Sequence, residues 1–141
     1  YCPGPSDIQC CVEGGPGPDP VSGDYGVDVS SSVSSSSASC LSDSGNNFII
    51  PRGFCSTGSV DPSVCTTIIN AYKAGFKTRD TYMFPCPTCS SSASSQMGTL
   101  VDYLNSHCKS EWSGRVWLDI EGSQYWTGSS SNNKAWYEDL V

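Results

Sequence analysis

The segment RVWLDIEG, residues 115–122, decides how the rest of the chain is interpreted. Its first six residues carry the apolar and β-branched side chains typical of a short strand. Side chains two residues apart point to the same face of a strand, so Asp119 and Glu121 are predicted to lie together at its C-terminal end. Trp117 falls in the same alternation, and it either lines or fills the space beside them.

Four strand-and-helix units can be followed outward from this segment. The predicted strands are residues 25–29, 47–54, 79–84 and 115–120. The predicted helices are residues 61–75, 92–107 and a last one from Asn132 or Asn133. The serine-rich run 30–45 looks like a low-complexity linker taken alone, but its apolar residues make a weak helix or an ordered loop about equally likely. This order is typical of a parallel sheet with right-handed crossovers. The expected fold class is α/β, a (β/α)-barrel of TIM-like type with only the first four βα units present in this chain.

Local signals refine this outline. Asp61 is predicted to cap its helix with Pro62 at the first helical position, and Gly75 to end that helix. Pro51 suggests an interruption near the end of the second strand. The buried face of the helix from Asp61 is predicted to contain Val64, Ile68, Ala71 and Tyr72.

Residues 1–23 differ in composition from the rest of the chain. They are rich in Pro and Gly, contain three cysteines and have no helical or strand period. We expect a Cys/Pro/Gly-rich segment or linker here and one domain over residues 24–141. Because the chain starts at Tyr1 without a Met or an apolar leader, a mature or trimmed product is expected.

Cysteine content and charge restrict the compartment and the partners. Nine cysteines and one His in 141 residues favour disulfides over Cys/His zinc sites, and therefore secretion. The formal net charge is −7 without a basic cluster, which excludes nucleic acid as a partner. No apolar run approaches the roughly 18 residues of a membrane span, so no membrane partner is expected. We expect no metal or other cofactor and a monomer.

Asp28 ends the first strand in the way that Asp119 ends the fourth. In a barrel, the C-terminal ends of the strands form the active site, so Asp28, Asp119 and Glu121 are predicted to converge. Two carboxylates at such a place are the usual groups for cleaving a glycosidic bond, one of them protonated because burial and its charged neighbour raise its pKa. Calcium binding through oxygen ligands is an alternative, and so is a pair without chemistry.

Four segments resemble the family 25 glycoside hydrolase lysozymes of eukaryotes. They are YGVDVS, FIIPRGF, YMFPCPTCSSSASSQM and VWLDIEGSQYW, in the order and spacing of that family over residues 24–141. The resemblance implies cleavage of the β-1,4 bond between N-acetylmuramic acid and N-acetylglucosamine, with peptidoglycan as the partner. It covers about the first half of the usual catalytic domain.

The resemblance also implies roles for individual residues. Glu121 matches the general acid, and Asp119 the acid that assists the substrate's N-acetyl group or a water. Asp28 matches a supporting acid and Tyr82 an aromatic of the sugar cleft. Arg52 stands near a position where many bacterial members have Lys.

Further aromatic residues have two interpretations. Tyr125 and Trp126 follow the acids and either stack on sugar rings or pack beneath their loop. Trp136 and Tyr137 are expected in the core, and Trp112 as a cover over a loop.

The cysteine pairing is open on sequence grounds. Proximity in the expected fold suggests two bridges within residues 24–141, Cys55 with Cys65 and Cys108 with Cys86 or Cys89. Cys2 with Cys10 or Cys11 would close the N-terminal segment. The CxxC of residues 86–89 admits a redox function, but a structural disulfide is the favoured interpretation.

Two functions compete with a muramidase. One is a non-catalytic domain that binds carbohydrate or the bacterial wall with the same fold. The other is a small disulfide-rich effector or inhibitor, which leaves the three aligned acids unexplained.

Overall fold

The structure is a computed structural model that describes residues 24–141. The predictions for residues 1–23, including the pairing of Cys2, lie outside the described residues. The elements, in chain order, are β1 (Tyr25–Val29), α1 (Ser35–Asp43), β2 (Asn46–Cys55), β3 (Ser59–Val60), α2 (Val64–Lys73), β4 (Thr78–Arg79), β5 (Thr81–Met83), α3 (Ala93–His107), β6 (Val116–Leu118) and α4 (Ser130–Glu138).

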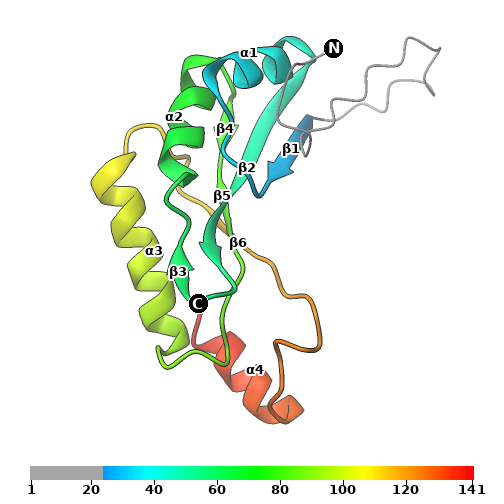
Figure 1. The fold of residues 1–141 in the computed structure, drawn as a ribbon, viewed down its shortest axis with the longest axis vertical. Coiled ribbons are helices and arrows are strands. Elements are labelled where there is room, and N and C mark those ends of the chain that lie inside the picture. The colour runs from blue at the N-terminus through cyan, green and yellow to red at the C-terminus, as the bar shows by residue number, and fades with distance from the viewer. Residues whose placement is uncertain (1–23) are drawn as a thin grey trace, which may run out of the picture.

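The strands form a mostly parallel sheet in the order β1-β2-β5-β6. β4 pairs with the first half of β2 in parallel, and the two-residue β3 pairs with its end in antiparallel orientation. Helices α1, α2 and α3 lie along one side of the sheet, and α4 lies beyond the end toward which the parallel strands run (Figure 1). The α/β class and the parallel sheet are confirmed, while closure into a barrel stays a prediction.

β2 corrects the expected interruption at Pro51. The strand is continuous over ten residues, but its neighbour on one side changes from β4 to β5 near the proline. The Thr81 hydroxyl donates to the Pro51 carbonyl at 2.7 Å across this junction. Gly53 allows the close approach that follows, because a Cβ there would lie 2.5 Å from Thr81 Oγ1 and 2.8 Å from Leu100 Cδ1. A change of partner thus replaces the predicted break.

The predicted strand 79–84 consists of two short strands separated by Asp80. Asp80 is 3 % exposed, and its carboxylate accepts a hydrogen bond from the Trp117 indole N–H at 2.9 Å. Backbone pairing with β2 stops at Arg79 and resumes at Tyr82.

Serines cap three of the helices that the structure describes. The hydroxyls of Ser34, Ser92 and Ser129 each accept from the backbone N–H three residues on, which begins α1, α3 and α4. The serine-rich run therefore contains a helix, and the predicted Asn132 or Asn133 cap of α4 is wrong. The hydroxyl prevails because it reaches the free N–H groups of the first turn.

The helix after Asp61 starts later than predicted. α2 begins at Val64, and its N-cap position is Ser63, whose side chain makes no capping bond. Asp61 accepts from the backbone N–H and the hydroxyl of Ser63 and binds Arg52, so it closes a turn before the helix. Gly75 follows α2 with φ 87°, as its predicted role in ending the helix requires.

Two apolar clusters lie between the helices and the sheet. The larger contains Phe54, Ile68, Met83, Leu100 and Leu104, and the smaller contains Val33, Ala38, Leu41, Ile49, Ala71 and Phe76. Trp112 and Trp136 pack partly buried against the larger cluster. Tyr72 and Tyr137 are 53 % and 41 % exposed, so their predicted burial is wrong.

The disulfides correct the expected pairing. Cys65 bonds to Cys108, both buried in the larger cluster, and Cys86 bonds to Cys89. Cys40 is also disulfide-bonded. Among the cysteines of residues 24–141, Cys55 carries the free thiol, and its Sγ lies 3.9 Å from Asp61 Oδ2. No helix in these residues is long and apolar enough to cross a membrane.

Candidate active site

Strand alternation places the candidate residues on the sheet face that α1–α3 leave open. Val27 and Val29 pack against the smaller cluster, so Asp28 between them faces the other way. Val116 and Leu118 pack against the larger cluster, and Trp117 between them is turned to the open face. Local strand geometry therefore selects which side chains reach the site.

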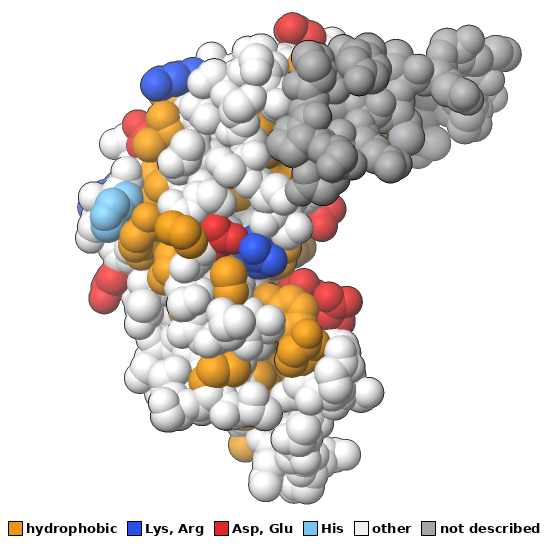
Figure 2. All heavy atoms as spheres, in the orientation of Figure 1, with side chains coloured by type: hydrophobic (Ala, Val, Ile, Leu, Met, Phe, Trp, Pro, Cys, Tyr) orange, Lys and Arg blue, Asp and Glu red, His pale blue; other side chains and the backbone are white. Residues whose placement is uncertain are grey.

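A pocket of about 380 Å³ lies on this face. Its described lining consists of Asp28, Ile50, Tyr82, Trp117, Leu118, Asp119 and Glu121. On the face drawn in Figure 2, acidic side chains lie beside hydrophobic ones at the concave edge of the molecule, and the basic side chains stand singly. The structure thus brings together all three predicted acids with two of the predicted aromatics.

Asp119 and Glu121 lie just beyond β6 and not on it. The Asp119 N–H donates to the Met83 carbonyl at 3.0 Å, which continues the ladder with β5 for one more residue. Gly122 then adopts φ 69°, and a Cβ there would lie 2.7 Å from the Tyr125 ring. The chain turns at this glycine immediately after the second acid.

Burial and the neighbouring acids make ionisation of the Asp119 carboxyl unfavourable. Its pKa is raised above the ordinary value, first by burial and then by the negative charges of Glu121 and Asp28. None of the described lining residues is basic, so no cation in the lining offsets these charges. Such a cluster destabilises the fold at neutral pH, which is typical of a site kept for function.

The arrangement of the acids can be compared with the needs of a metal ion. In the described part of the chain, no three His, Cys, Asp or Glu side chains are grouped so that they could hold a metal ion. Calcium requires six to eight oxygen ligands around one point. Backbone carbonyls and waters supply part of such a ligand set, so the calcium alternative stays a prediction.

Tyr82 and Trp117 form aromatic walls of the pocket and pair with each other across β5 and β6. Burial raises the pKa of the Tyr82 phenol, the Arg52 charge opposes this, and the nearby acids add to it. Trp117 is 47 % exposed, but its indole N–H is held by the Asp80 carboxylate. Arg115 Cζ lies 5.4 Å from the centroid of the Trp117 ring, and Arg115 Nη1 lies 3.7 Å from Asp80 Oδ2.

Comparison with known proteins identifies the family to which this chain belongs. A family model described as lysozyme-like protein 1 matches residues 20–141. This chain belongs to the lysozyme-like proteins of glycoside hydrolase family 25. The predicted resemblance is thereby confirmed. No solved structure matches the chain significantly.

Curated relatives of this lysozyme-like chain occur in amoebae and nematodes. Two from Dictyostelium discoideum, named probable GH family 25 lysozymes 2 and 4, are 47 % and 41 % identical over 116 residues. Lysozyme-like protein 5 of Caenorhabditis elegans is 36 % identical over 118 residues. Each alignment covers 82 % of this chain and 53 % of the relative. The chain thus spans about half the length of the curated relatives it matches.

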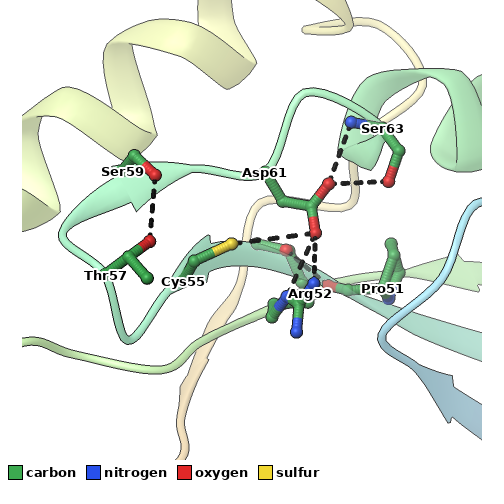
Figure 3. A network of polar contacts seen from close by, with 8 residues as sticks. Pro51, Arg52, Cys55, Thr57, Ser59, Asp61 and Ser63 are labelled. Atoms are coloured by element: carbon green, nitrogen blue, oxygen red, sulfur yellow. Dashed lines mark hydrogen bonds and ion pairs between the residues drawn. The ribbon is translucent and has the colours of Figure 1, made fainter.

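Arg52 lies beside the lysozyme-like pocket but outside its described lining. Its Nε and Nη2 donate to Asp61 Oδ2 at 3.0 and 2.9 Å (Figure 3). Burial alone would raise the pKa of Asp61, but hydrogen bonds from Ser63 and the Arg52 guanidinium outweigh burial and lower it. The guanidinium is therefore engaged with Asp61, and Arg52 acts on the pocket through its charge at Tyr82.

Tyr125 and Trp126 also lie outside the described lining of this pocket. Tyr125 packs edge-on against Phe84 with ring centroids 5.0 Å apart. Trp126 packs edge-on against Trp136 at 5.6 Å. The packing interpretation of both residues fits these contacts, and their role in sugar binding stays a prediction.

Sequence reasoning missed three residues of the site. Ile50 and Leu118 supply apolar lining, and Asp80 holds Trp117. Asp80 and Tyr82 are two apart in the sequence, so strand alternation could have placed both on the open face. The apolar pair carries no comparable signal, because such residues are equally common in cores.

Proposed function

We propose that this chain contributes the acidic site of a secreted glycoside hydrolase that cleaves peptidoglycan between N-acetylmuramic acid and N-acetylglucosamine. The carrying observation is that Asp28, Asp119 and Glu121 line one pocket with two aromatic walls and no described basic residue. Aromatic faces suit sugar rings, and paired carboxylates suit glycosidic bonds. Family membership and the disulfides support the substrate class and the secretion.

In this proposal Glu121 and Asp119 have separate roles. The Glu121 carboxyl gives its proton to the glycosidic oxygen while the C–O bond breaks and its electron pair stays on that oxygen. Positive charge then develops at the anomeric carbon or in the substrate's N-acetyl group, and the Asp119 carboxylate stabilises it. Water finally adds to the sugar and returns a proton to Glu121.

The environment of Asp119 suits this assignment. Burial and two neighbouring acids make its negative charge costly in the free protein, as its raised pKa indicates. The cost is relieved when a positive charge forms beside it, and an interaction that strengthens only in the transition state accelerates the reaction. The negative charge of Asp28, on β1, also stabilises a positive charge at this place.

Substrates with different leaving groups separate the two roles. On a bacterial wall suspension, Glu121→Gln and Asp119→Asn are both expected to lose lysis. On a nitrophenyl glycoside, whose leaving group needs no proton, Glu121→Gln is expected to retain much more activity than Asp119→Asn. The control is Glu138→Gln, because Glu138 is an exposed acid on α4. Near-normal wall lysis by Glu121→Gln would contradict the proposal, and reversed behaviour on the nitrophenyl substrate would exchange the roles.

A non-catalytic carbohydrate-binding role is the second candidate. The exposed ring of Trp117 and the half-buried Tyr82 form a surface that can bind sugars without any proton transfer. This role predicts wall binding that depends on Trp117 and no lysis by the protein with all three acids intact.

A further inference from the structure

A second hollow, separate from the acidic pocket, lies between the loop of Cys86–Cys89 and helix α4. Its volume is about 210 Å³. Its described lining consists of Pro87, Thr88, Thr127, Gly128, Asn132, Asn133 and Trp136, none of which lines the acidic pocket. We propose that this groove binds one neutral sugar unit of a glycan strand.

The first wall of the groove is a short loop held at both ends. Pro87 and Thr88 are the two residues enclosed by the Cys86–Cys89 disulfide. Gln96, which is 1 % exposed, accepts from the Cys86 N–H at 3.0 Å and donates to the Cys86 carbonyl at 2.9 Å. The wall is therefore formed before any ligand arrives, which reduces the entropy lost on binding.

The second wall is fastened to α4 by its own contacts. Asn133 Nδ2 donates to the carbonyls of Trp126 and Gly128 at 3.0 and 3.2 Å, so the segment that contains Thr127 is tied to the helix. Trp126 packs edge-on against Trp136 and holds the indole that lines the groove.

The chemistry of the lining favours a neutral sugar over an ion. None of the described lining residues is charged. Trp136 and Pro87 offer apolar rings, and Thr88, Thr127 and Asn132 offer neutral donors and acceptors. Within residues 24–141, the side chains of Thr127 and Asn132 make no hydrogen bond, so both can bind a ligand. A pyranose presents the same combination of an apolar face and a rim of hydroxyls.

The size of the groove limits the ligand to one small unit. Pockets for drug-sized molecules have roughly 300–1,000 Å³, and this groove is smaller. It is built by segments that follow β5 and β6, as is the acid pair, so both hollows lie at the carboxyl edge of the sheet. The inference rests on the proposed function only in naming a glycan as the polymer, because the groove itself contains no acid.

Titration with tri-N-acetylchitotriose, followed by the NMR signals of backbone amides and indole N–H groups, tests the inference. The Glu121→Gln background prevents turnover during the measurement. We expect shifts at Thr88, Thr127, Asn132 and the Trp136 indole. Thr88→Val/Asn132→Ala removes two neutral hydrogen-bonding groups at exposed positions and is expected to raise the Kd about tenfold.

The matched control is Thr66→Val/Asn105→Ala, which makes the same changes at exposed positions on α2 and α3. Its Kd is expected to equal that of the background. Shifts confined to the acidic pocket, no binding, or an unchanged Kd in the groove variant would each overturn the inference. If Glu121→Gln loses lysis but the groove variant keeps an unchanged Kd, the groove inference is wrong and the proposed hydrolase function stands. If the groove binds the sugar but the protein with all three acids intact cleaves no glycan, the groove inference stands and the proposed function is wrong.

Discussion

The covered and the open face of the sheet are built from the same strands but carry opposite residues. On the covered face, Met83 and Phe54 meet Leu100 in a cluster that is closed to water. On the open face, Asp28 and Trp117 remain exposed around a pocket with three acids. Packing stabilises the first face, whereas like charges weaken the second. A single alternation along each strand thus separates the packed side chains from the residues of the candidate site, and substitutions on the two faces should have separable effects.

The largest expected effect is on catalysis, at the open face. Glu121→Gln should lower the rate of wall lysis by roughly 10²–10⁴-fold, the usual contribution of a general acid. Its free energy of unfolding should stay within about 0.5 kcal/mol of wild type, because Glu121 is exposed. Turbidity and urea denaturation measure the two quantities. A large loss of stability in Glu121→Gln would contradict the idea that substitutions on the two faces have separable effects.

The converse change lies on the covered face. Leu100→Ala removes a fully buried side chain from the larger cluster and should cost about 2–5 kcal/mol in the free energy of unfolding. The nitrophenyl glycoside rate of the remaining folded protein should be near that of wild type. Urea denaturation with a parallel rate assay checks this. A large fall in the nitrophenyl glycoside rate of the folded Leu100→Ala protein, alongside its loss of stability, would show that the two faces are coupled through β5.

Trp117 tests whether the open face also contains a structural contact. Trp117→Phe removes the N–H that binds Asp80 and should cost about 1 kcal/mol, because a buried carboxylate loses a partner. The matched control is Trp112→Phe, which loses a weaker bond of 3.4 Å to the Arg115 carbonyl. A larger loss in the control would show that the Asp80 contact contributes little.

The smallest expected effect is a gain in stability. Asp119 has a raised pKa in the folded protein, so its contribution to stability is present below the unfolded pKa of about 4 and is lost as pH rises through the folded pKa. Asp119→Asn should therefore be more stable than wild type at pH 7, by roughly 0.5 kcal/mol for this partly exposed group. Denaturation at pH 7 and pH 4 should show this difference shrinking in acid.

Asp61 provides a control of opposite sign for the pH measurement. Its pKa is lowered in the folded protein, so its contribution is present above the unfolded pKa and is lost as pH falls through the folded pKa. Asp61→Asn should be less stable than wild type at pH 7, and this deficit should also shrink in acid. The same sign for both variants at pH 7 would contradict the assigned pKa directions.

Local periodicity explains what could be predicted from the sequence. Alternation was enough to predict Asp119 and Glu121 on one face, the position of Asp28 at a strand end indicated that it lies near them, and the order of strands and helices indicated the parallel sheet. The features that could not be predicted depend on contacts between segments that are distant in the sequence. The pairing of Cys65 with Cys108 and the bond of Trp117 to Asp80 join residues more than 30 positions apart. The cap of α4 was predicted at Asn132 or Asn133 instead of Ser129 for a different reason, since several adjacent residues can cap equally well on composition alone.

The bridge between Cys65 and Cys108 has a consequence for survival among proteases. It closes a covalent ring that contains β4, β5 and α3, with the Cys86–Cys89 bridge inside it. One peptide cut between Cys65 and Cys108, which are 43 positions apart, leaves both ends attached. A molecule cut once within this span therefore stays in one covalent piece.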